Sequence, residues 1–256
     1  MTARRLLCAL SAAAALASPA RADELITLPT RSSVTMSYWH MPRPGAATTL
    51  LLLPGGAGGI GLRDGRPQSG NFLVRSRDAF AGYGFHVALL GRPSDVADMD
   101  TVFRASAAHM EDLRRVIDDL RARTQTPVWL VGTSRGTVSA AAAAIALGPE
   151  RLAGVVLTSS VTAFKHHGVP TLALQTVRVP VLVLHHEKDA CPSCAPHEVP
   201  LIIDRLTQAP VKKLIWAHEG TGARGDPCEP FHWHGFIGME EQAVQAIVTW
   251  VRQPTP

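Results

Sequence analysis

The 256-residue sequence lacks the motifs that mark several large functional classes. It has no cluster of lysine and arginine with interleaved aromatic side chains, so nucleic-acid binding has no support. No Gly-Lys-Ser/Thr follows its glycine-rich loop, which excludes a Walker-type phosphate loop. There is no internal repeat, and an apolar content of 46% is typical of a globular rather than a disordered chain. This length is sufficient for one sizeable domain with a full core.

Residues that bind metal ions are few and poorly spaced. Three histidine-containing clusters supply candidate ligand atoms: His185-His186-Glu187, His166-His167 and His232-x-His234. None of the three has a spacing such as H-E-x-x-H, so the sequence does not indicate a metal site. We expect no metal and no other cofactor.

Residues 1–22 have the pattern of a secretory signal peptide. Arg4 and Arg5 supply the positive n-region, and Leu6–Ala17 supplies an apolar h-region that is too short for a permanent membrane span. Ala20-Arg21-Ala22 fits an A-x-A cleavage site. This pattern predicts cleavage before Asp23.

Export changes the charge balance of the chain. Arg4, Arg5 and Arg21 fall in the leader, so residues 23–256 carry 22 basic and 21 acidic side chains, a net charge of about +1. We expect a single domain over 23–256 that is periplasmic or secreted, with no membrane span after processing. An uncleaved N-terminal anchor and twin-arginine export are the alternatives.

The stretch Thr126–Leu147 has the pattern of a nucleophile elbow. An apolar run, Val128–Val131, predicts a buried strand, and an alanine-rich run predicts the helix that follows. Between them lies Gly132-Thr133-Ser134-Arg135-Gly136, which is G-x-S-x-G. A serine at so tight a turn has a strained backbone, and side chains two residues away would collide there, which favours glycine at both positions. The turn also places Ser134 at a helix N-terminus, where free N–H groups favour developing negative charge. An ordinary strand–turn–helix junction is the alternative.

A second glycine-rich segment follows a buried strand. Thr49–Leu53 is continuously apolar, and Pro54-Gly-Gly-Ala-Gly-Gly-Ile-Gly61 comes directly after it. Glycines let backbone N–H groups approach a ligand closely, but the spacing is not that of a dinucleotide fingerprint and no helix opens at the end of the loop. With Ser134 downstream, we interpret this segment as an oxyanion loop, and a flexible turn is the alternative.

Strands alternate with helices along the chain. The expected strands are Glu24–Thr30, Ser33–Met41, Thr49–Leu53, Phe85–Leu90, Val128–Val131, Leu152–Thr158, Val181–His186 and Lys213–Ala217. The expected helices are Asn71–Gly82, Phe103–Arg123, Arg135–Leu147, Glu198–Leu206 and Met239–Arg252. This alternation predicts an α/β fold with a mostly parallel central sheet and helices on both faces, whose ligand site lies at the carboxyl ends of the strands. The link Ser159–Arg178 is too short for more than a minimal lid.

A carboxylate follows the strand Val181–His186 at a suitable place for catalysis. Asp189 is the candidate acid, which would orient a catalytic imidazole and stabilise its protonated form. Glu187 is its nearest competitor, since it lies closer to the end of the strand.

A histidine lies between the last strand and the last helix. His234 can reach Ser134 from this position and act as general base and then as general acid. His232 and His218 are the competing histidines. The chain order of serine, aspartate and histidine is the order described for the elbow motif.

Taken together, these residues resemble the α/β-hydrolase superfamily over nearly the whole chain after the leader. The matching segments are Leu51–Gly59, Gly132–Gly136, Val181–Asp189 and His234-Gly235-Phe236. More narrowly, Asn71–Arg77, Cys228 and His234–Glu240 are similar to a group of exported bacterial hydrolases of poorly defined activity.

The resemblance implies a role for each site residue. Ser134 would be the nucleophile, Asp189 the acid and His234 the base. The oxyanion hole would consist of the backbone N–H of Arg135 and that of Gly56 or Ala57. Pro54 departs from the family, because many members have histidine before the first glycine of this loop.

Three cysteines remain after the leader, and an exported protein is expected to oxidise two of them. A Cys191–Cys228 bridge would join the acid loop to the base loop, and Cys191–Cys194 is the alternative pairing. A thioredoxin-like role for the second pair is disfavoured, because it does not open a helix in a β–α–β unit.

The leading functional hypothesis is an exported serine hydrolase, namely a carboxylic-ester hydrolase that acts on a small-molecule acyl substrate. A peptidase or amidase, or an acyltransferase, would use the same triad. A non-catalytic binding protein of the same fold and a thiol–disulfide protein are alternatives from other classes. Arg135, beside the nucleophile, could bind a substrate carboxylate or point into solvent. No motif encodes the individual substrate or the oligomeric state.

Overall fold

The computed structural model describes residues 22–256. The expected signal peptide therefore lies outside the described residues, apart from Ala22. Within 22–256, no helix is both long and apolar enough to cross a bilayer.

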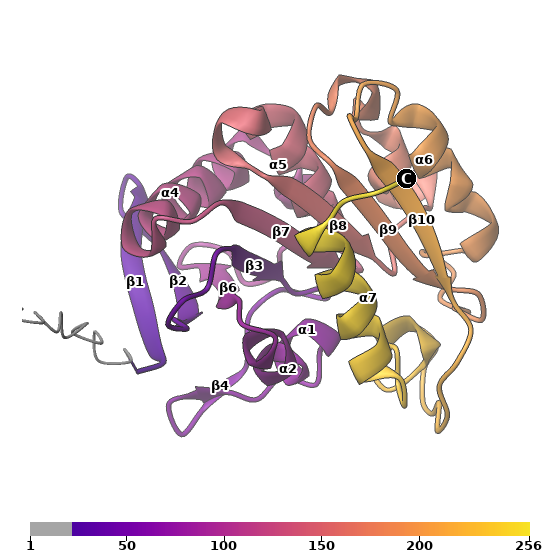
Figure 1. Ribbon diagram of the computed structural model, residues 1–256, viewed down its shortest axis with the longest axis horizontal. Helices are drawn as coiled ribbons and strands as arrows, with labels where there is room; N and C mark the ends of the chain where they lie inside the picture. The colour runs from indigo at the N-terminus through magenta and orange to yellow at the C-terminus, as the bar shows by residue number, and fades with distance from the viewer. Residues whose placement is uncertain (1–21) are drawn as a thin grey trace, which may run out of the picture.

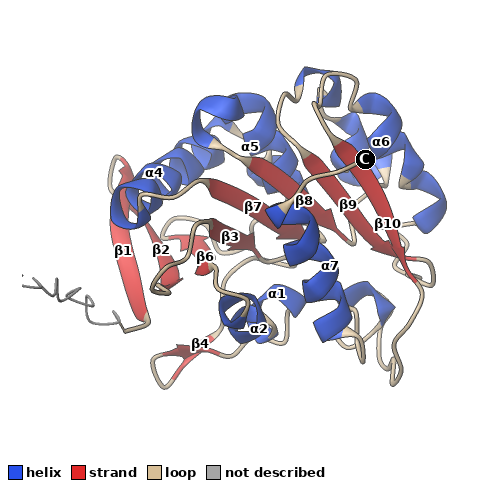
Figure 2. Ribbon diagram, in the orientation of Figure 1, coloured by secondary structure: helices blue, strands red, loops and turns tan. Residues whose placement is uncertain are grey.

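An eight-stranded sheet forms the centre of the fold (Figures 1 and 2). Its strands, in spatial order, are β1 (Glu24–Arg31), β2 (Val34–Met41), β6 (His86–Pro93), β3 (Thr49–Leu53), β7 (Val128–Thr133), β8 (Gly154–Thr158), β9 (Val181–His186) and β10 (Lys212–Ala217). The pairs β1–β2 and β2–β6 are antiparallel, and all the others are parallel. The mostly parallel sheet expected from the sequence is thus confirmed.

Helices cover both faces of the sheet (Figure 1). One face carries α4 (Ala107–Thr124), α5 (Gly136–Arg151) and α6 (Pro200–Arg205), and the other carries α1 (Phe72–Arg75), α2 (Arg77–Gly82) and α7 (Glu240–Arg252). Two apolar cores result, one beneath each helical layer. Every residue of β3, β7, β8 and β9 is buried, because these strands are covered on both sides.

The register brings the loops of the site to one edge of the sheet. Leu53 at the end of β3 lies beside Gly132, and Thr133 at the end of β7 lies beside Thr158 of β8. The glycine-rich loop, the turn at Ser134 and the loop after β8 therefore start next to one another.

Two helices expected to be continuous are interrupted. The segment 71–82 forms α1 and α2, which are separated at Ser76. The segment 103–123 forms α3 (Thr101–Arg104) and α4, because the Ser106 side chain accepts a hydrogen bond from the His109 N–H and starts a new helix there. The Ser106 hydroxyl oxygen accepts from a backbone N–H in place of a helical carbonyl oxygen, and apolar periodicity does not reveal such a bond.

Smaller elements also differ from expectation. The helix expected to end at Leu147 continues as α5 to Arg151, with a kink at Gly148, which has a φ of +58°. A short hairpin of β4 (Leu62–Arg63) and β5 (Arg66–Pro67) follows the glycine-rich loop and was not predicted. The link after β8 contains only three 3-10 turns, at Phe164–His166, Val169–Thr171 and Leu174–Thr176. The site has no large lid.

Candidate active site

The turn at Ser134 has the strained geometry of an elbow. Ser134 has a φ of +53°, in the left-handed region that residues other than glycine rarely adopt. A Cβ on Gly132 would lie 2.4 Å from the Gly136 carbonyl oxygen, and a Cβ on Gly136 would lie 2.0 Å from that of Leu53. Both glycines are therefore required by direct backbone contact. The Ser134 N–H donates to the Thr158 carbonyl oxygen at 3.1 Å, which ties the turn to the neighbouring strand.

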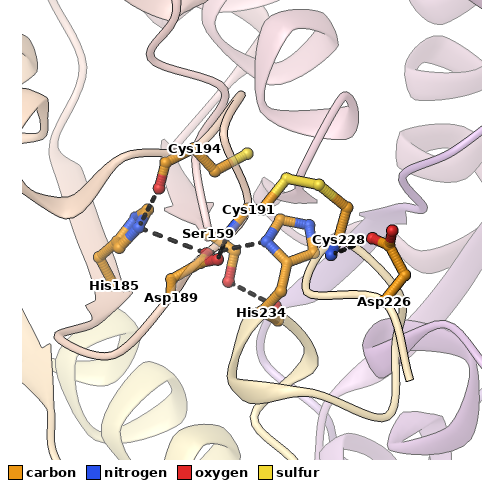
Figure 3. Close-up of a disulfide and its surroundings, with 8 residues drawn as sticks. All are labelled: Ser159, His185, Asp189, Cys191, Cys194, Asp226, Cys228 and His234. Carbon is orange, nitrogen blue, oxygen red and sulfur yellow. Dashed lines mark hydrogen bonds and ion pairs between the residues drawn. A yellow bond between two sulfur atoms is a disulfide. The ribbon is translucent and has the colours of Figure 1, made fainter. Parts of the chain in front are cut away.

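Asp189 and His234 form a buried pair (Figure 3). His234 Nδ1 and Asp189 Oδ2 are 2.8 Å apart, and both side chains are almost fully buried. The Cys191 N–H donates to the other carboxylate oxygen of Asp189 at 3.0 Å. The Ser159 hydroxyl donates to the His234 carbonyl oxygen at 2.7 Å and holds the base loop. The Cys191 N–H thus orients the carboxylate, and the Ser159 hydroxyl holds the histidine that faces it.

The other ring nitrogen of His234 is available for proton transfer. His234 Nε2 is buried and has no hydrogen-bond partner among residues 22–256. Ser134 and His234 line the same cavity of about 360 Å³, together with Gly55–Gly59. A substrate carbonyl in this cavity would be within reach of both side chains.

The competing residues have other partners. Glu187 is exposed and lies 2.7 Å from His218, and this hydrogen bond lowers the pKa of Glu187. The His232 ring lies against Trp233, with ring centroids 5.2 Å apart, and His232 does not line the cavity beside Ser134. The Glu187–His218 pair is thus exposed, whereas Asp189 and His234 form a buried pair, and His234 lines the cavity that contains Ser134.

His185 lies behind the carboxylate and was not expected there. Its Nε2 donates to the Cys194 carbonyl oxygen at 3.0 Å and lies 3.5 Å from Asp189 Oδ2. Burial lowers the pKa of His185 to about 4, so the ring is neutral at neutral pH. Asp189 therefore has one neutral histidine behind it and the candidate base in front of it (Figure 3).

The disulfide joins Cys191 to Cys228, with their Cα atoms 4.5 Å apart. It is the pairing favoured above, and it links the Asp189 loop to the loop that precedes His234 (Figure 3). Cys194 is a buried free thiol, and burial raises its pKa.

Metal-ligand atoms meet at one place in the described part of the chain. Sulfur atoms of Cys191 and Cys194 and a ring nitrogen of His234 lie within 4.8 Å of one another. Cys191 is bonded to Cys228 and offers no thiolate, so this group does not fit a metal ion.

Backbone donors surround Ser134. The N–H groups of Gly56, Ala57 and Arg135 have no hydrogen-bond partner within residues 22–256. A Cβ on Gly55 would lie 2.7 Å from Ser134 Cβ, so the glycine-rich loop approaches the serine as closely as backbone allows. Unpaired N–H groups of this kind can donate hydrogen bonds to a ligand beside Ser134.

Arg135 points toward the surface. Its side chain is 41% exposed, and its guanidinium donates to Asp98 at 3.1 Å. Together with Ser134 and Cys194, it lines a second cavity of about 440 Å³ on the site. A larger groove of about 910 Å³ near the β4–β5 hairpin includes neither Ser134 nor His234, so we assign the site to the two smaller cavities.

Neither a protein-family model nor a curated protein sequence matches this chain. Solved structures match it over about nine-tenths of its length. An esterase from Pyrococcus furiosus is 12% identical, with a TM-score of 0.67, over 90% of this chain and 92% of that one. A serine hydrolase without a lid from Xanthomonas campestris is 19% identical, with a TM-score of 0.60, over 92% and 97%. A dienelactone hydrolase from Anabaena variabilis is 16% identical, with a TM-score of 0.65, over 91% and 98%. The chain has the α/β-hydrolase fold.

Proposed function

We propose that this chain is an exported serine hydrolase that cleaves carboxylic esters of small molecules. The observation that carries the proposal is the buried 2.8 Å contact between His234 Nδ1 and Asp189, next to an elbow serine that shares a cavity with the same histidine. An α/β-hydrolase fold does not by itself imply this activity, but the three residue types occur at the corresponding strand ends of the fold.

The reaction proceeds through an acyl-enzyme. Ser134 Oγ attacks the ester carbonyl carbon while His234 Nε2 takes the hydroxyl proton. Asp189 stabilises the imidazolium, and the N–H groups of Arg135 and of Gly56 or Ala57 stabilise the oxyanion. The carbonyl re-forms, the carbon–oxygen bond of the ester breaks, and the leaving alkoxide takes the proton from His234. In the second half of the reaction, His234 takes a proton from water, and the water oxygen attacks the acyl carbon. The bond to Ser134 Oγ then breaks, Oγ takes the proton from His234, and the carboxylic acid is released.

Small and varied esters fit the site better than one long lipid. The link after β8 carries only short turns, and the two cavities that meet at Ser134 have volumes of about 360 and 440 Å³. The neighbours from Pyrococcus and Anabaena are called an esterase and a dienelactone hydrolase, which are both ester-cleaving activities. No cofactor takes part in this chemistry.

Export is supported by the cysteines and by the leader pattern. The Cys191–Cys228 disulfide is of a kind that persists in oxidising compartments. Together with the signal-peptide pattern of residues 1–22, this favours the periplasm or the cell exterior.

The activity is tested with p-nitrophenyl acetate and butyrate on the 23–256 protein and its variants. We expect Ser134→Ala and His234→Ala to lower kcat by at least about 10⁴-fold and Asp189→Asn by about 10³- to 10⁴-fold. Glu187→Gln is the matched carboxylate control and retains the wild-type rate. Ester hydrolysis that survives Ser134→Ala would contradict the proposal.

A panel of amides and of alcohol acyl acceptors separates the remaining activities. Faster turnover of amides than of matched esters would identify a peptidase or amidase. Product that partitions to the alcohol rather than to water would identify an acyltransferase. A folded wild-type protein that turns over none of these substrates would favour the non-catalytic binding protein.

A further inference from the structure

Arg104, the last residue of α3, is a buried cation whose hydrogen bonds all go to neutral groups, while the charges of Asp98 and Asp100 act on it from nearby. Its relative exposure is 1%, and no carboxylate of residues 22–256 forms an ion pair with it. Burial lowers its pKa to about 9, and the nearby charge of Arg135 contributes in the same direction, which still leaves the guanidinium protonated at neutral pH. A buried charge is costly unless all its donors are satisfied, so this arginine must have specific partners.

Two of the four hydrogen-bond partners of Arg104 are carbonyl oxygens of the glycine-rich loop. Its Nη2 donates to the carbonyl oxygens of Pro54 at 3.0 Å and Gly56 at 3.3 Å. Its Nε donates to the Met99 carbonyl oxygen at 2.8 Å, and its Nη1 donates to the Ser139 hydroxyl at 3.1 Å. A single side chain thus links the loop after β3 to the segment before α3 and to α5.

These contacts determine which way the peptide units of the loop face. In a trans peptide the C=O and N–H groups point in opposite directions. The Gly56 carbonyl faces Arg104, so the N–H of Ala57, which shares that peptide unit, faces the opposite way. The Ala57 N–H has no partner within 22–256, and Ala57 lines both cavities that contain Ser134.

The remaining carbonyls of the loop are also occupied. Gly55 O accepts from the Gly58 N–H at 3.1 Å, and Ala57 O accepts from the Met99 N–H at 3.0 Å. The carbonyl oxygens of residues 54–57 therefore all have donors, while the N–H groups of Gly56 and Ala57 have no acceptor in the described part of the chain. A loop of this composition has many other accessible conformations, since glycines restrict it little.

We propose that Arg104 is a positioning residue that holds the Pro54 and Gly56 carbonyls away from Ser134 and so aims the Ala57 N–H at the oxyanion. It also places a positive charge behind these peptide dipoles. This inference rests on the proposed function, since it concerns the oxyanion of the same reaction. The effect belongs to the transition state, because the oxyanion is absent from the bound ester.

A merely structural anchor would behave differently. Loss of an anchor lowers the fraction of folded enzyme, and each folded molecule keeps its rate. Loss of a positioning residue lowers kcat per active site and weakens binding of tetrahedral adducts, while KM for the planar ester changes little.

The test compares Arg104→Met and Arg104→Lys with wild type and with Arg121→Met. Arg121 also donates to a backbone carbonyl, that of Glu150 at 2.7 Å, and it lies at the surface in α4. We measure kcat and KM for p-nitrophenyl acetate per titrated active site, the inhibition constant of phenylboronic acid, and the thermal midpoint of each variant. Boronic acids form a tetrahedral adduct with a serine nucleophile and so report on the oxyanion hole.

We expect Arg104→Met to lower kcat by about 30- to 100-fold, somewhat less than the loss of an oxyanion donor itself. Its KM stays within about threefold, and the inhibition constant of the boronic acid rises by a factor similar to the loss in kcat. Arg104→Lys keeps the charge but lacks the fork that spans two carbonyls, so it loses about tenfold in kcat. Arg121→Met retains the wild-type kcat and inhibition constant.

The proposal is overturned if folded Arg104→Met has a kcat and a boronic-acid inhibition constant within threefold of wild type. If Arg104→Met does not fold, Arg104→Lys decides, and a wild-type kcat in that variant overturns the proposal. A wild-type protein that neither cleaves the ester nor binds the boronic acid removes the proposed function itself, which is a distinct result.

Discussion

Removal of the Cys191–Cys228 bridge tests how the acid loop and base loop are held together. The two cysteines are 37 residues apart in sequence. Closing a loop of this length in the unfolded chain corresponds to about 4 kcal/mol of stability at 25 °C. For a domain of this size, that loss lowers the thermal midpoint by about 8–15 °C.

The bridge also affects the active site. Asp189 lies two residues before Cys191, and His234 lies six residues after Cys228, so the bridge restrains both members of the buried pair. We expect the loss of this restraint to lower kcat about tenfold, since small displacements of catalytic groups are costly.

The variant is the double substitution Cys191→Ala/Cys228→Ala. A single Cys228→Ala substitution would leave Cys191 free to bond Cys194, because their sulfur atoms lie within 4.8 Å of each other. Cys194→Ala is the control, which removes a buried sulfur but no bridge and should cost about 1 kcal/mol.

Urea unfolding at 25 °C and the rate of p-nitrophenyl acetate hydrolysis are the two assays. The reasoning is refuted if the double variant unfolds with a free energy within about 1 kcal/mol of wild type. It is equally refuted if Cys194→Ala destabilises as much as the double variant, since Cys194 would then be a bridge partner.

Two further predictions concern the backbone at the elbow and the buried histidines. Gly136→Ala would place a Cβ 2.0 Å from the Leu53 carbonyl oxygen, so we expect loss of soluble folded protein or at least about 100-fold lower kcat. Gly82→Ala is the control, because a Cβ at that position meets nothing within 4 Å. A fully active Gly136→Ala enzyme would contradict the geometry. Burial lowers the pKa of His109 to about 3 and that of His185 to about 4, so between these values and about 6.5 the unfolded state binds more protons and stability falls as the pH falls. Each histidine contributes a slope of about 1.4 kcal/mol per pH unit in that range, and His109→Gln should remove its share in urea unfolding from pH 4.5 to 7.5; an unchanged slope would show that His109 is not buried in its neutral form.

The sheet was predictable because its central strands are mostly apolar segments bounded by polar or glycine-rich residues. β3 and β9 are buried on both faces, and the expected bounds Thr49–Leu53 and Val181–His186 match both strands to the residue. The elbow was predictable for a related reason, since direct backbone contacts at Gly132 and Gly136 leave room for no other residue.

The helix breaks were not predictable from periodicity. Phe103–Arg123 has one apolar stripe, but the Ser106 side chain bonds to the backbone of the next turn and divides it into α3 and α4. That choice depends on whether α3 can pack with Arg104 beneath the glycine-rich loop, and this contact is about fifty residues distant in sequence. Local patterns carry no information about such contacts.

The candidate site was predicted unevenly for the same reason. Ser134, Asp189 and His234 follow strand ends, and the structure brings them together as a nucleophile turn beside a buried acid–histidine pair. His185 and Arg104 were not predicted, because each contacts residues of the site that are distant in sequence or in another element. A histidine inside a strand and an arginine at the end of a short helix resemble many structural residues in sequence, and only their burial and partners distinguish them.

The central claim is that Ser134 is a nucleophile activated by His234. The most direct measurement treats the folded 23–256 protein with a fluorophosphonate probe and maps the adduct by mass spectrometry, with Ser134→Ala and His234→Ala alongside. The account predicts one adduct per chain on the peptide that contains Ser134, none in Ser134→Ala, and labelling at least about 100-fold slower in His234→Ala. A folded wild-type protein that stays unlabelled, or an adduct on another residue, would contradict it.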